Sequence, residues 1–313
     1  MCRNGDQRRY AIARGILPVS RGSLQRMASL LDHPRYEVLP TASTEDSVLE
    51  WVPRDVTVTV TASPVKGLEP TLALAGRLAA QGYRAAPHLS ARLVKDQGHL
   101  ADIVDQLLAA GISDVFVPAG DADPPAGPFD SALSLLQQLD QLGRPFANVG
   151  VTGYPQSHPV IGDDVTIQAM WDKRQYATYL VSNLCFDPRT LRQWVRRIRA
   201  RGVTLPLFVG LAGPIERTRL LKMAAKAGIA ESSRFLARHG EWFVRLGTPG
   251  AYDPEGLLGD VSSALTAADA GVKGLHIFTF NQVQQTERWR QELLQRASRA
   301  PMPPASRGMH PDP

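Results

Sequence analysis

The sequence predicts a single (β/α)8 barrel of the TIM type, and three observations support this fold class. The chain has 313 residues, 43% of them hydrophobic and 21% charged, which suits one large domain with a full core. From about residue 35 onward, short β-rich runs alternate with longer helical patterns, which favours a parallel sheet covered by helices. Eight such runs are present, the number that closes a barrel.

The predicted strands are short runs rich in Val, Ile, Leu, Thr and aromatic residues, bounded by Gly, Pro, Asp or Ser. The second run alternates Val and Thr and stops at Ser63-Pro64. Later runs are more continuously apolar, as expected for parallel strands buried on both faces. In order, the runs are 36–39, 55–62, 84–90, 112–120, 148–154, 178–186, 205–213 and 274–280.

Helical patterns fill the intervals, and several carry end signals. The segment 67–82 closes on Gly82, a typical C-cap, and Asp187-Pro188 supplies an N-cap followed by Pro at the first helical position. Helices are predicted at 67–82, 96–110, 130–143, 163–177, from 188 onward, and at 216–228, 231–239, 254–270 and 282–298.

A doubly wound open sheet is the alternative arrangement of alternating βα units. It would normally be shorter or carry a Gly-rich first turn, and no GxGxxG follows any predicted strand. We therefore assign residues 34–299 to the barrel, residues 1–33 to an N-terminal extension and residues 300–313 to a flexible Pro-rich tail.

Composition also bears on partners. The formal net charge of +5 invites a nucleic-acid partner, but Arg8-Arg9 lies in the extension and the run from Arg189 to Arg201 fits the solvent face of one helix. Cys2 and Cys185 form no CxxC pair, so neither a metal site nor a disulfide framework is predicted. The sequence offers no bilayer-spanning run and no secretory core, so we expect no nucleic acid, no membrane and a cytoplasmic location.

Polar residues at strand ends are the candidates for chemistry, because the βα loops build the site of a barrel there. Glu37 has the strongest case, since a carboxylate inside a barrel strand is costly to bury unless it is paired or used. Asp121 has a structural alternative as a turn cap, His88 as a core histidine and Asn183 as a partner of backbone groups. The remaining candidates are Thr59, Thr61, Gly120, Tyr154, His158 and Ser182.

Six segments, taken together and in order, resemble the methylenetetrahydrofolate reductase family. They are YEVLP (36–40), APHLS (86–90), GD (120–121), YPQSHP (154–159), SNLCFD (182–187) and GVKGLHIFTFN (271–281). The family's counterparts read FEFFPP, APHLT, the end of LRGD, YPExHP, TQFFFD and GVKxxHxYTLN. No single segment decides the matter, but the shared order and spacing are strong support for the resemblance.

The resemblance implies reduction of 5,10-methylenetetrahydrofolate to 5-methyltetrahydrofolate. Glu37 matches the family's general acid, which protonates N10 and opens the imidazolidine ring to a 5-iminium cation. Asp121 matches the carboxylate that binds the pterin and favours that cation. Asn183 stands at a Gln position of the substrate site. In a more loosely matching segment, Phe235 is expected to stack on the pterin or nicotinamide and Arg238 to reach the folate glutamate, although a surface helix explains both equally.

Family members normally pass the hydride through FAD, and here the flavin-binding residues depart from the pattern. Ala119 replaces the Arg of LRGD, and Trp171 and Asp172 stand where the family has Arg-Lys; a slip of one or two residues would bring Lys173 and Arg174 there. We therefore expect NADH to deliver the hydride directly, with FAD as the alternative cofactor. The candidate cofactor-binding residues are Thr61, His88, Gly120, Tyr154 and His158.

Three alternatives stay open at this stage. The chain could be an FAD-dependent reductase of the same family, an enzyme that acts on methyltetrahydrofolate in the oxidative direction, or a non-catalytic folate-binding homologue. The eroded opening motif and the Gln-to-Asn change favour the last, whereas the presence of both Glu37 and Asp121 favours an enzyme. Folate and NADH are the expected small-molecule partners, and homo-oligomers are common in the family.

Overall fold

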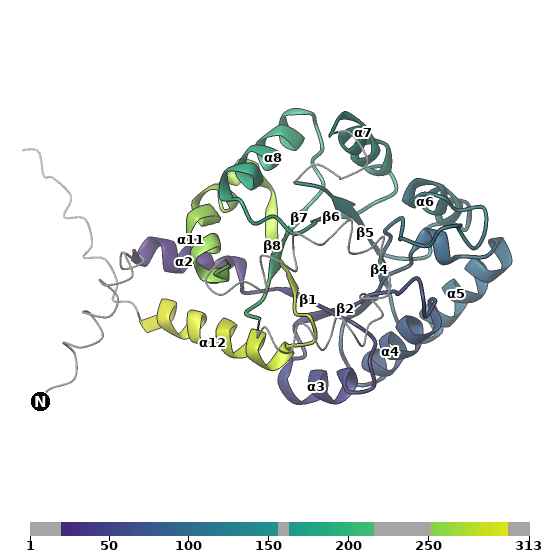
Figure 1. The fold of residues 1–313 in the computed structure, drawn as a ribbon, viewed down its shortest axis with the longest axis horizontal. Coiled ribbons are helices and arrows are strands. Elements are labelled where there is room, and N and C mark those ends of the chain that lie inside the picture. Colours follow the sequence, from purple (N-terminus) through teal and green to yellow (C-terminus); the bar gives the residue numbers. More distant parts are fainter. Residues whose placement is uncertain (1–19, 156–162, 216–251, 300–313) are drawn as a thin grey trace, which may run out of the picture.

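The computed structural model describes residues 20–155, 163–215 and 252–299. Within them, eight parallel strands form one sheet in the order β3-β2-β1-β8-β7-β6-β5-β4 (Figure 1). The strands are β1 (Arg35–Val38), β2 (Thr57–Val60), β3 (Ala85–Pro87), β4 (Asp114–Phe116), β5 (Asn148–Gly153), β6 (Tyr179–Ser182), β7 (Leu207–Ala212) and β8 (Val272–Phe278).

The two ends of that strand order, β3 and β4, meet just past the end of β3. His88 forms a parallel bridge with Phe116, and the backbone N–H of Leu89 donates to the Phe116 carbonyl at 2.8 Å. The sheet therefore closes on itself, which leaves it no free edge. The predicted (β/α)8 barrel is confirmed, and the doubly wound alternative is wrong.

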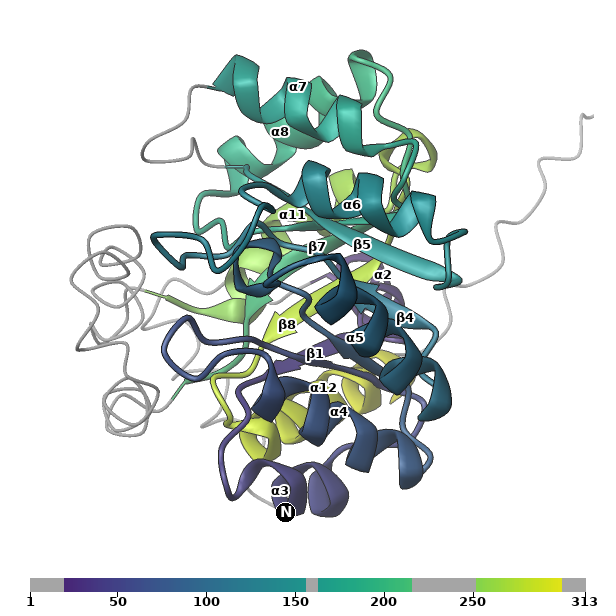
Figure 2. The ribbon, with the colours of Figure 1, turned by 90° about the vertical axis from the view of Figure 1, so that its right-hand side faces the viewer.

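Helices surround the barrel on all sides (Figures 1 and 2). One of them, α3, fills the interval between the first two strands, where the sequence analysis named no helix. The predicted helices at 216–228 and 231–239 lie outside the described residues. The described α-helices are α2 (Arg21–Leu30), α3 (Thr44–Trp51), α4 (Glu69–Ala80), α5 (Gln97–Ala109), α6 (Ala132–Gln141), α7 (Asp163–Lys173), α8 (Pro188–Ala200), α11 (Pro254–Leu265) and α12 (Val283–Arg299).

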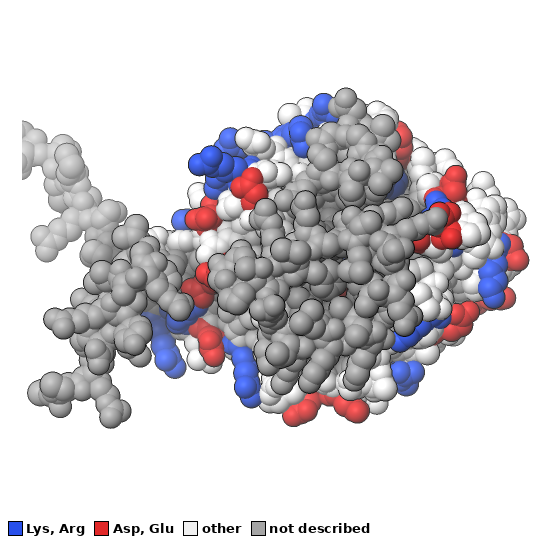
Figure 3. All heavy atoms as spheres, in the orientation of Figure 1, with Lys and Arg blue, Asp and Glu red and all other residues white. Residues whose placement is uncertain are grey.

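Helix α8 shows how the sequence pattern becomes a barrel helix. Asp187 caps it by accepting from the backbone N–H groups of Arg189 and Thr190, and Pro188 occupies its first position. Its apolar face, which includes Trp194, is buried, while its arginines point outward or pack along the surface. Blue side chains gather over α8 at the upper left of Figure 3. The predicted solvent-facing arginine run is thus confirmed.

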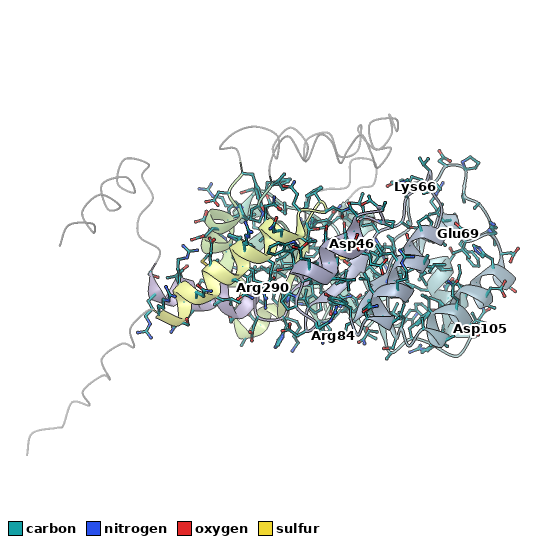
Figure 4. All side chains as sticks on the ribbon, turned by 90° about the horizontal axis from the view of Figure 1, so that it is seen from below. Asp46, Lys66, Glu69, Arg84, Asp105 and Arg290 are labelled. Carbon is teal, nitrogen blue, oxygen red and sulfur yellow. The ribbon has the colours of Figure 1, made fainter. Side chains whose placement is uncertain are left out.

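Helix α2 precedes the first strand and packs against α11 and α12. Met27, Leu30 and Leu31 are buried in the main hydrophobic core. Arg290, labelled on α12 in Figure 4, donates to the carbonyls of Leu31 (2.8 Å) and Asp32 (3.0 Å) and so holds the end of this segment. Part of the predicted N-terminal extension is therefore packed on the barrel, and the boundary at residue 33 stays a prediction.

Most strands stop earlier than the sequence predicts, mainly at their carboxyl ends. The fourth was predicted over 112–120, but its ladder covers only Asp114–Phe116. The residues beyond leave the ladder because they turn into βα loops toward the next helix. His88, Gly120, Asp121 and Asn183 consequently lie just past the strands and not within them.

Candidate active site

Glu37 points into the barrel from β1. Its neighbours Tyr36 and Val38 are fully buried on the other face of the strand, where Tyr36 donates a 2.6 Å hydrogen bond to Glu287 of α12. Because side chains alternate along a strand, Glu37 faces the interior. Only 15% of its side-chain surface is exposed, so the carboxyl is largely desolvated.

Two imidazoles face the Glu37 carboxyl inside the barrel. The Nε2 atom of His276, on β8, lies 2.9 Å from Glu37 Oε2, which is a hydrogen bond. The Nε2 atom of His88 lies 3.7 Å from the same oxygen, too far for a hydrogen bond, and none of the described residues offers it another partner. The ring of Phe116 lies 4.8 Å from that of His88, and the ring of Phe278 lies 5.0 Å from that of His276. The carboxyl thus sits among two imidazoles and two phenyl rings.

Burial shifts the ionisation of all three groups toward the neutral form. Desolvation raises the pKa of Glu37 from 4.5 to about 7, although nearby His88 lowers it somewhat. Desolvation, assisted by the Arg35 charge, lowers the pKa of His276 to about 3. Desolvation likewise lowers the pKa of His88 to about 4, against the opposing effect of Glu37. Near pH 7 the imidazoles are neutral, and Glu37 can hold a proton and release it, as a general acid must.

A second polar cluster closes the barrel floor beneath this site. The Arg35 guanidinium donates to Asp114 (3.0 Å) and Tyr179 (2.7 Å), and the Tyr179 hydroxyl donates to Asp114 at 2.8 Å. Gly150 makes room for it, since a Cβ there would lie 2.3 Å from the Tyr179 ring. This floor cluster fixes one positive and one negative charge in a closed network.

The end of β8 holds the loop that follows Glu37. The side chain of Asn281 accepts from the backbone N–H of Leu39 (2.8 Å) and donates to the Leu39 carbonyl (3.1 Å) and to Thr44 (3.0 Å). Thr279 donates through its hydroxyl to the Glu37 carbonyl at 2.6 Å. Phe280 and Asn281 both have positive φ, of 48° and 58°, a conformation that costs free energy unless the surroundings impose it.

Gly120 and Asp121 lie at the carboxyl end of β4. Gly120 has a φ of 87°, and a Cβ there would lie 3.0 Å from the Cβ of Ser90, so the turn requires glycine. Asp121 follows it and is half-buried. The structure thus explains Gly120 by backbone geometry, and its assignment to cofactor binding stays a prediction.

The other described candidates also lie at strand ends. Thr61 follows β2, where its carbonyl accepts from Thr71 at 2.7 Å, and Tyr154 follows β5. Asn183 follows β6 and is half-buried, and its Oδ1 accepts from the N–H of Leu184 at 3.0 Å. The backbone-bonding alternative for Asn183 is therefore realised for its oxygen, and its predicted substrate contact is untested.

Several candidates lie outside the described residues or turn out to be structural. His158, Phe235 and Arg238 lie outside the described residues. Thr59 is buried and donates to the Tyr36 carbonyl at 3.2 Å, and the buried Ser182 hydroxyl accepts from the N–H of Gly210 at 2.8 Å. These two hydroxyls bond the backbone of neighbouring strands, which gives both a structural role.

His276, Thr279 and Asn281 belong to the site although the sequence alone did not predict them as site residues. All three lie in GVKGLHIFTFN, a segment that pointed to the family but to no individual site residue. The available signal was a histidine in an otherwise apolar strand, together with Thr and Asn at its end. Without pairing of β8 to β1, nothing along the chain shows that this histidine faces Glu37, which lies 239 positions earlier.

The residues at and beside the positions where the family binds flavin phosphates have other contacts here. Trp171 lies against Gly202, in the turn that leads into β7, and the Arg174 guanidinium stacks 3.4 Å from the Trp171 ring centroid. Lys173 is buried, and burial lowers its pKa to about 8. Next to Ala119, the cation of Arg92 donates to the carbonyl of Ala122 at 2.6 Å. Lys173 is therefore buried, Arg174 is stacked on Trp171, and Arg92 is hydrogen-bonded to a carbonyl, so none of these three cations is free to bind a phosphate.

Comparison with known proteins identifies the family. The family model for methylenetetrahydrofolate reductase matches residues 41–293. The chain belongs to the methylenetetrahydrofolate reductase family. The predicted resemblance is thus confirmed, although the match begins just after Glu37, so the place of that residue rests on the barrel geometry and the opening motif.

Among curated proteins, methylenetetrahydrofolate reductase 2 of Saccharomyces cerevisiae is 25% identical over 179 residues. The aligned stretch covers 52% of this chain and 28% of the yeast protein. The chain therefore spans well under half of the relative it matches.

Among solved structures, 2,3-dimethylmalate lyase, of the PEP mutase/isocitrate lyase superfamily, resembles the chain in two crystal forms. In the triclinic form the identity is 13% and the TM-score 0.43, with 79% of this chain and 95% of that one covered. In the trigonal form the values are 13% and 0.43, with 82% and 97% covered. Similarity at this level carries no argument about function.

The described residues contain no cluster of three or more His, Cys, Asp or Glu side chains that could hold a metal ion. In the same part of the chain, no helix is both long and apolar enough to cross a membrane.

Proposed function

We propose that this chain reduces 5,10-methylenetetrahydrofolate to 5-methyltetrahydrofolate with NADH as the direct hydride donor. The observation that carries the proposal is the Glu37 carboxyl, largely desolvated at the mouth of a closed barrel and able to hold a proton near pH 7. Membership of the methylenetetrahydrofolate reductase family supplies the substrate class.

The reaction needs one proton and one hydride. Glu37 donates its proton to N10 of the folate, the bond between N10 and the bridging carbon breaks, and a 5-iminium cation results. Hydride from NADH then forms the new C–H bond, giving the methyl group and NAD⁺, and Glu37 regains a proton from solvent. Asp121, at the carboxyl end of β4, is the carboxylate proposed to favour the cation.

Direct transfer is favoured because the residues described here fit a flavin diphosphate poorly. Charge-assisted bonds to a phosphate stabilise binding by about 1.5–3 kcal/mol each. At the family's cation positions this chain has Ala119, Trp171 and Asp172, and the shifted alternatives Lys173 and Arg174 are buried or stacked on Trp171. We therefore derive no step through FAD.

The mouth offers other cations to anionic substrates. Lys66, in the loop between β2 and α4, and Lys95, in the loop after β3, are exposed. Figure 4 shows Lys66 near the carboxyl ends of the strands and Arg84 at the opposite end. We assign Lys66 to long-range attraction of the NADH phosphates or the folate glutamate.

The test is an assay of the purified full chain with NADH, NADPH and methylenetetrahydrofolate, with and without added FAD. Turnover with NADH alone, by protein that releases no flavin chromophore on denaturation, is the expected result. Stoichiometric FAD that turnover requires would establish the flavin-dependent alternative. Tight folate binding without any turnover would establish the non-catalytic homologue.

A further inference from the structure

The Glu37 carboxyl has two inequivalent oxygens. Oε2 lies 2.9 Å from His276 Nε2 and 3.7 Å from His88 Nε2, whereas none of the described residues bonds Oε1. An acid proton carried on Oε2 would be directed at an imidazole, and one carried on Oε1 would be free for a substrate. Which oxygen holds the proton therefore decides whether Glu37 can act as a general acid.

The surroundings of His276 decide where its own proton sits. The side chain is 1% exposed, and its buried Nδ1 atom has no hydrogen-bond partner in the part of the chain that the structure describes. A proton on Nδ1 would leave a buried N–H donor unsatisfied, which is costly. A proton on Nε2 has Glu37 Oε2 as its acceptor at 2.9 Å. Of the two neutral tautomers, the geometry favours the one protonated on Nε2.

We propose that His276 is a positioning residue for Glu37: its neutral imidazole donates from Nε2 to Oε2, which leaves Oε1 to carry the transferable proton. This inference rests on the proposed function for its catalytic meaning. The hydrogen bond itself belongs to the substrate-free protein and can be measured without turnover.

Among the described residues, few charged or titratable groups lie around His276. Arg35 lies two residues before Glu37 on β1, and its charge disfavours an imidazolium at His276. Asp114 on β4 and Tyr179 on β6 are hydrogen-bonded to Arg35. His88 on β3 is neutral near pH 7, since its pKa is lowered to about 4. These neighbours keep the His276 ring neutral, so that it donates one proton and does not compete for that of Glu37.

The first measurement is nitrogen NMR of the whole protein labelled with ¹⁵N-histidine. The sequence has 7 histidines, and the resonances of His276 are those lost in His276→Gln. We expect a ring protonated on Nε2 and bare on Nδ1 at pH 7. A ring protonated on Nδ1, or an imidazolium, would overturn the proposal even if the chain proves to be an active reductase.

The second measurement uses a matched pair of variants. In His276→Gln the side-chain amide reaches the place of Nε2 and can still donate, whereas His276→Leu cannot. Infrared spectra, with Glu37→Gln as the reference, follow protonation of the Glu37 carboxyl against pH. Loss of a hydrogen bond to the charged form should move this titration up by about one pH unit in His276→Leu. Glutamine should restore the wild-type value.

Turnover completes the test. We expect kcat at pH 7 to fall about ten-fold or more in His276→Leu, since general acid catalysis contributes about 10²–10⁴-fold, and to recover largely in His276→Gln. An unchanged Glu37 titration in His276→Leu refutes the positioning role. If the leucine variant does not fold, the NMR tautomer and the glutamine variant decide. Absence of turnover in the wild type, with the expected tautomer, refutes the proposed function alone.

Discussion

The interior of the barrel holds two polar clusters that differ in how well their groups are satisfied. At the floor, Arg35, Asp114 and Tyr179 each bond the other two, although the Nε atom of Arg35 has no partner among the described residues. At the mouth, the described residues give the Glu37 carboxyl one hydrogen bond and give none to one buried ring nitrogen each of His88 and His276. Arg35 and Glu37 are only two residues apart on β1, so a shift of two positions along the strand separates the floor cluster from the mouth cluster.

The difference separates a structural role from a chemical one. A closed ionic network pairs its charges with one another and holds together the strands that carry them. A carboxyl among neutral imidazoles and phenyl rings is desolvated. Desolvation raises its pKa, which makes its proton available near pH 7. This agrees with barrels in general, where the carboxyl ends of the strands carry function and the other end carries stability.

The largest expected effect is at the mouth. Glu37→Gln should lower the rate of methylenetetrahydrofolate reduction about 10²–10⁴-fold, because an amide cannot protonate N10. Folate binding should persist, as measured by calorimetry, since the side chain keeps its shape. Unchanged turnover would contradict the assignment of Glu37 as the acid.

At the floor, the expected effect is on stability. Asp114→Ala leaves the Arg35 guanidinium buried without its counter-charge, which should lower the free energy of unfolding by about 3–5 kcal/mol. Urea denaturation followed by circular dichroism measures it. The double variant Arg35→Met, Asp114→Ala is the control and should recover part of the loss. Equal stability of single variant and wild type would mean that the floor cluster does not stabilise the fold.

The pH dependence of stability tests the raised pKa of Glu37 in the mouth cluster. The pKa of Glu37 is raised from 4.5 to about 7 on folding, so its contribution to stability is fully present below pH 4.5 and is lost as pH rises through about 7. Relative to Glu37→Gln, the wild type should lose about 3 kcal/mol across this window. Denaturation at a series of pH values tests it, and a flat difference between the two proteins would refute the raised pKa.

A smaller effect on stability is expected from the hydrogen bonds of Asn281, which join the end of β8 to the loop after β1. Asn281→Ala and Asn281→Gly both remove the amide that bonds Leu39 and Thr44. The alanine variant must also adopt a φ of 58°, which glycine tolerates, so it should be about 1 kcal/mol less stable than the glycine variant. Thermal unfolding compares the pair, and equal stability would mean that the backbone relaxes when the amide is lost.

The smallest effect is expected from a rim cation. Lys66→Glu should raise KM for NADH or polyglutamylated folate a few-fold at low ionic strength, and added salt should reduce the difference. Lys273, exposed near the start of β8 at the floor end, gives the matched control Lys273→Glu. Equal effects of the two substitutions on KM would show that the position of Lys66 at the mouth does not matter for attracting the anionic substrate.

Local sequence determined the parts that depend on neighbouring residues. Alternation of β-rich and helical runs predicted the barrel, because each strand and helix must bury one face. The same pattern placed Glu37 in the first strand and Asp121 at the end of the fourth, but it placed His88 and Asn183 inside strands that end one residue before them. Helix ends were placed to within a few residues, while strand ends were overextended because apolar runs continue into the loops.

Only the tertiary structure decided which of these residues meet. Closure of the sheet brings β8 beside β1, and this pairing sets His276 against Glu37 and Asn281 against Leu39. It also buries Arg35 with Asp114 and Tyr179, which lie 79 and 144 positions away along the chain. The ionisation of a group depends on its burial and on charges brought near it by folding. A sequence can therefore show that Glu37 is a carboxyl in a strand, but its pKa and its partner come from the closed barrel.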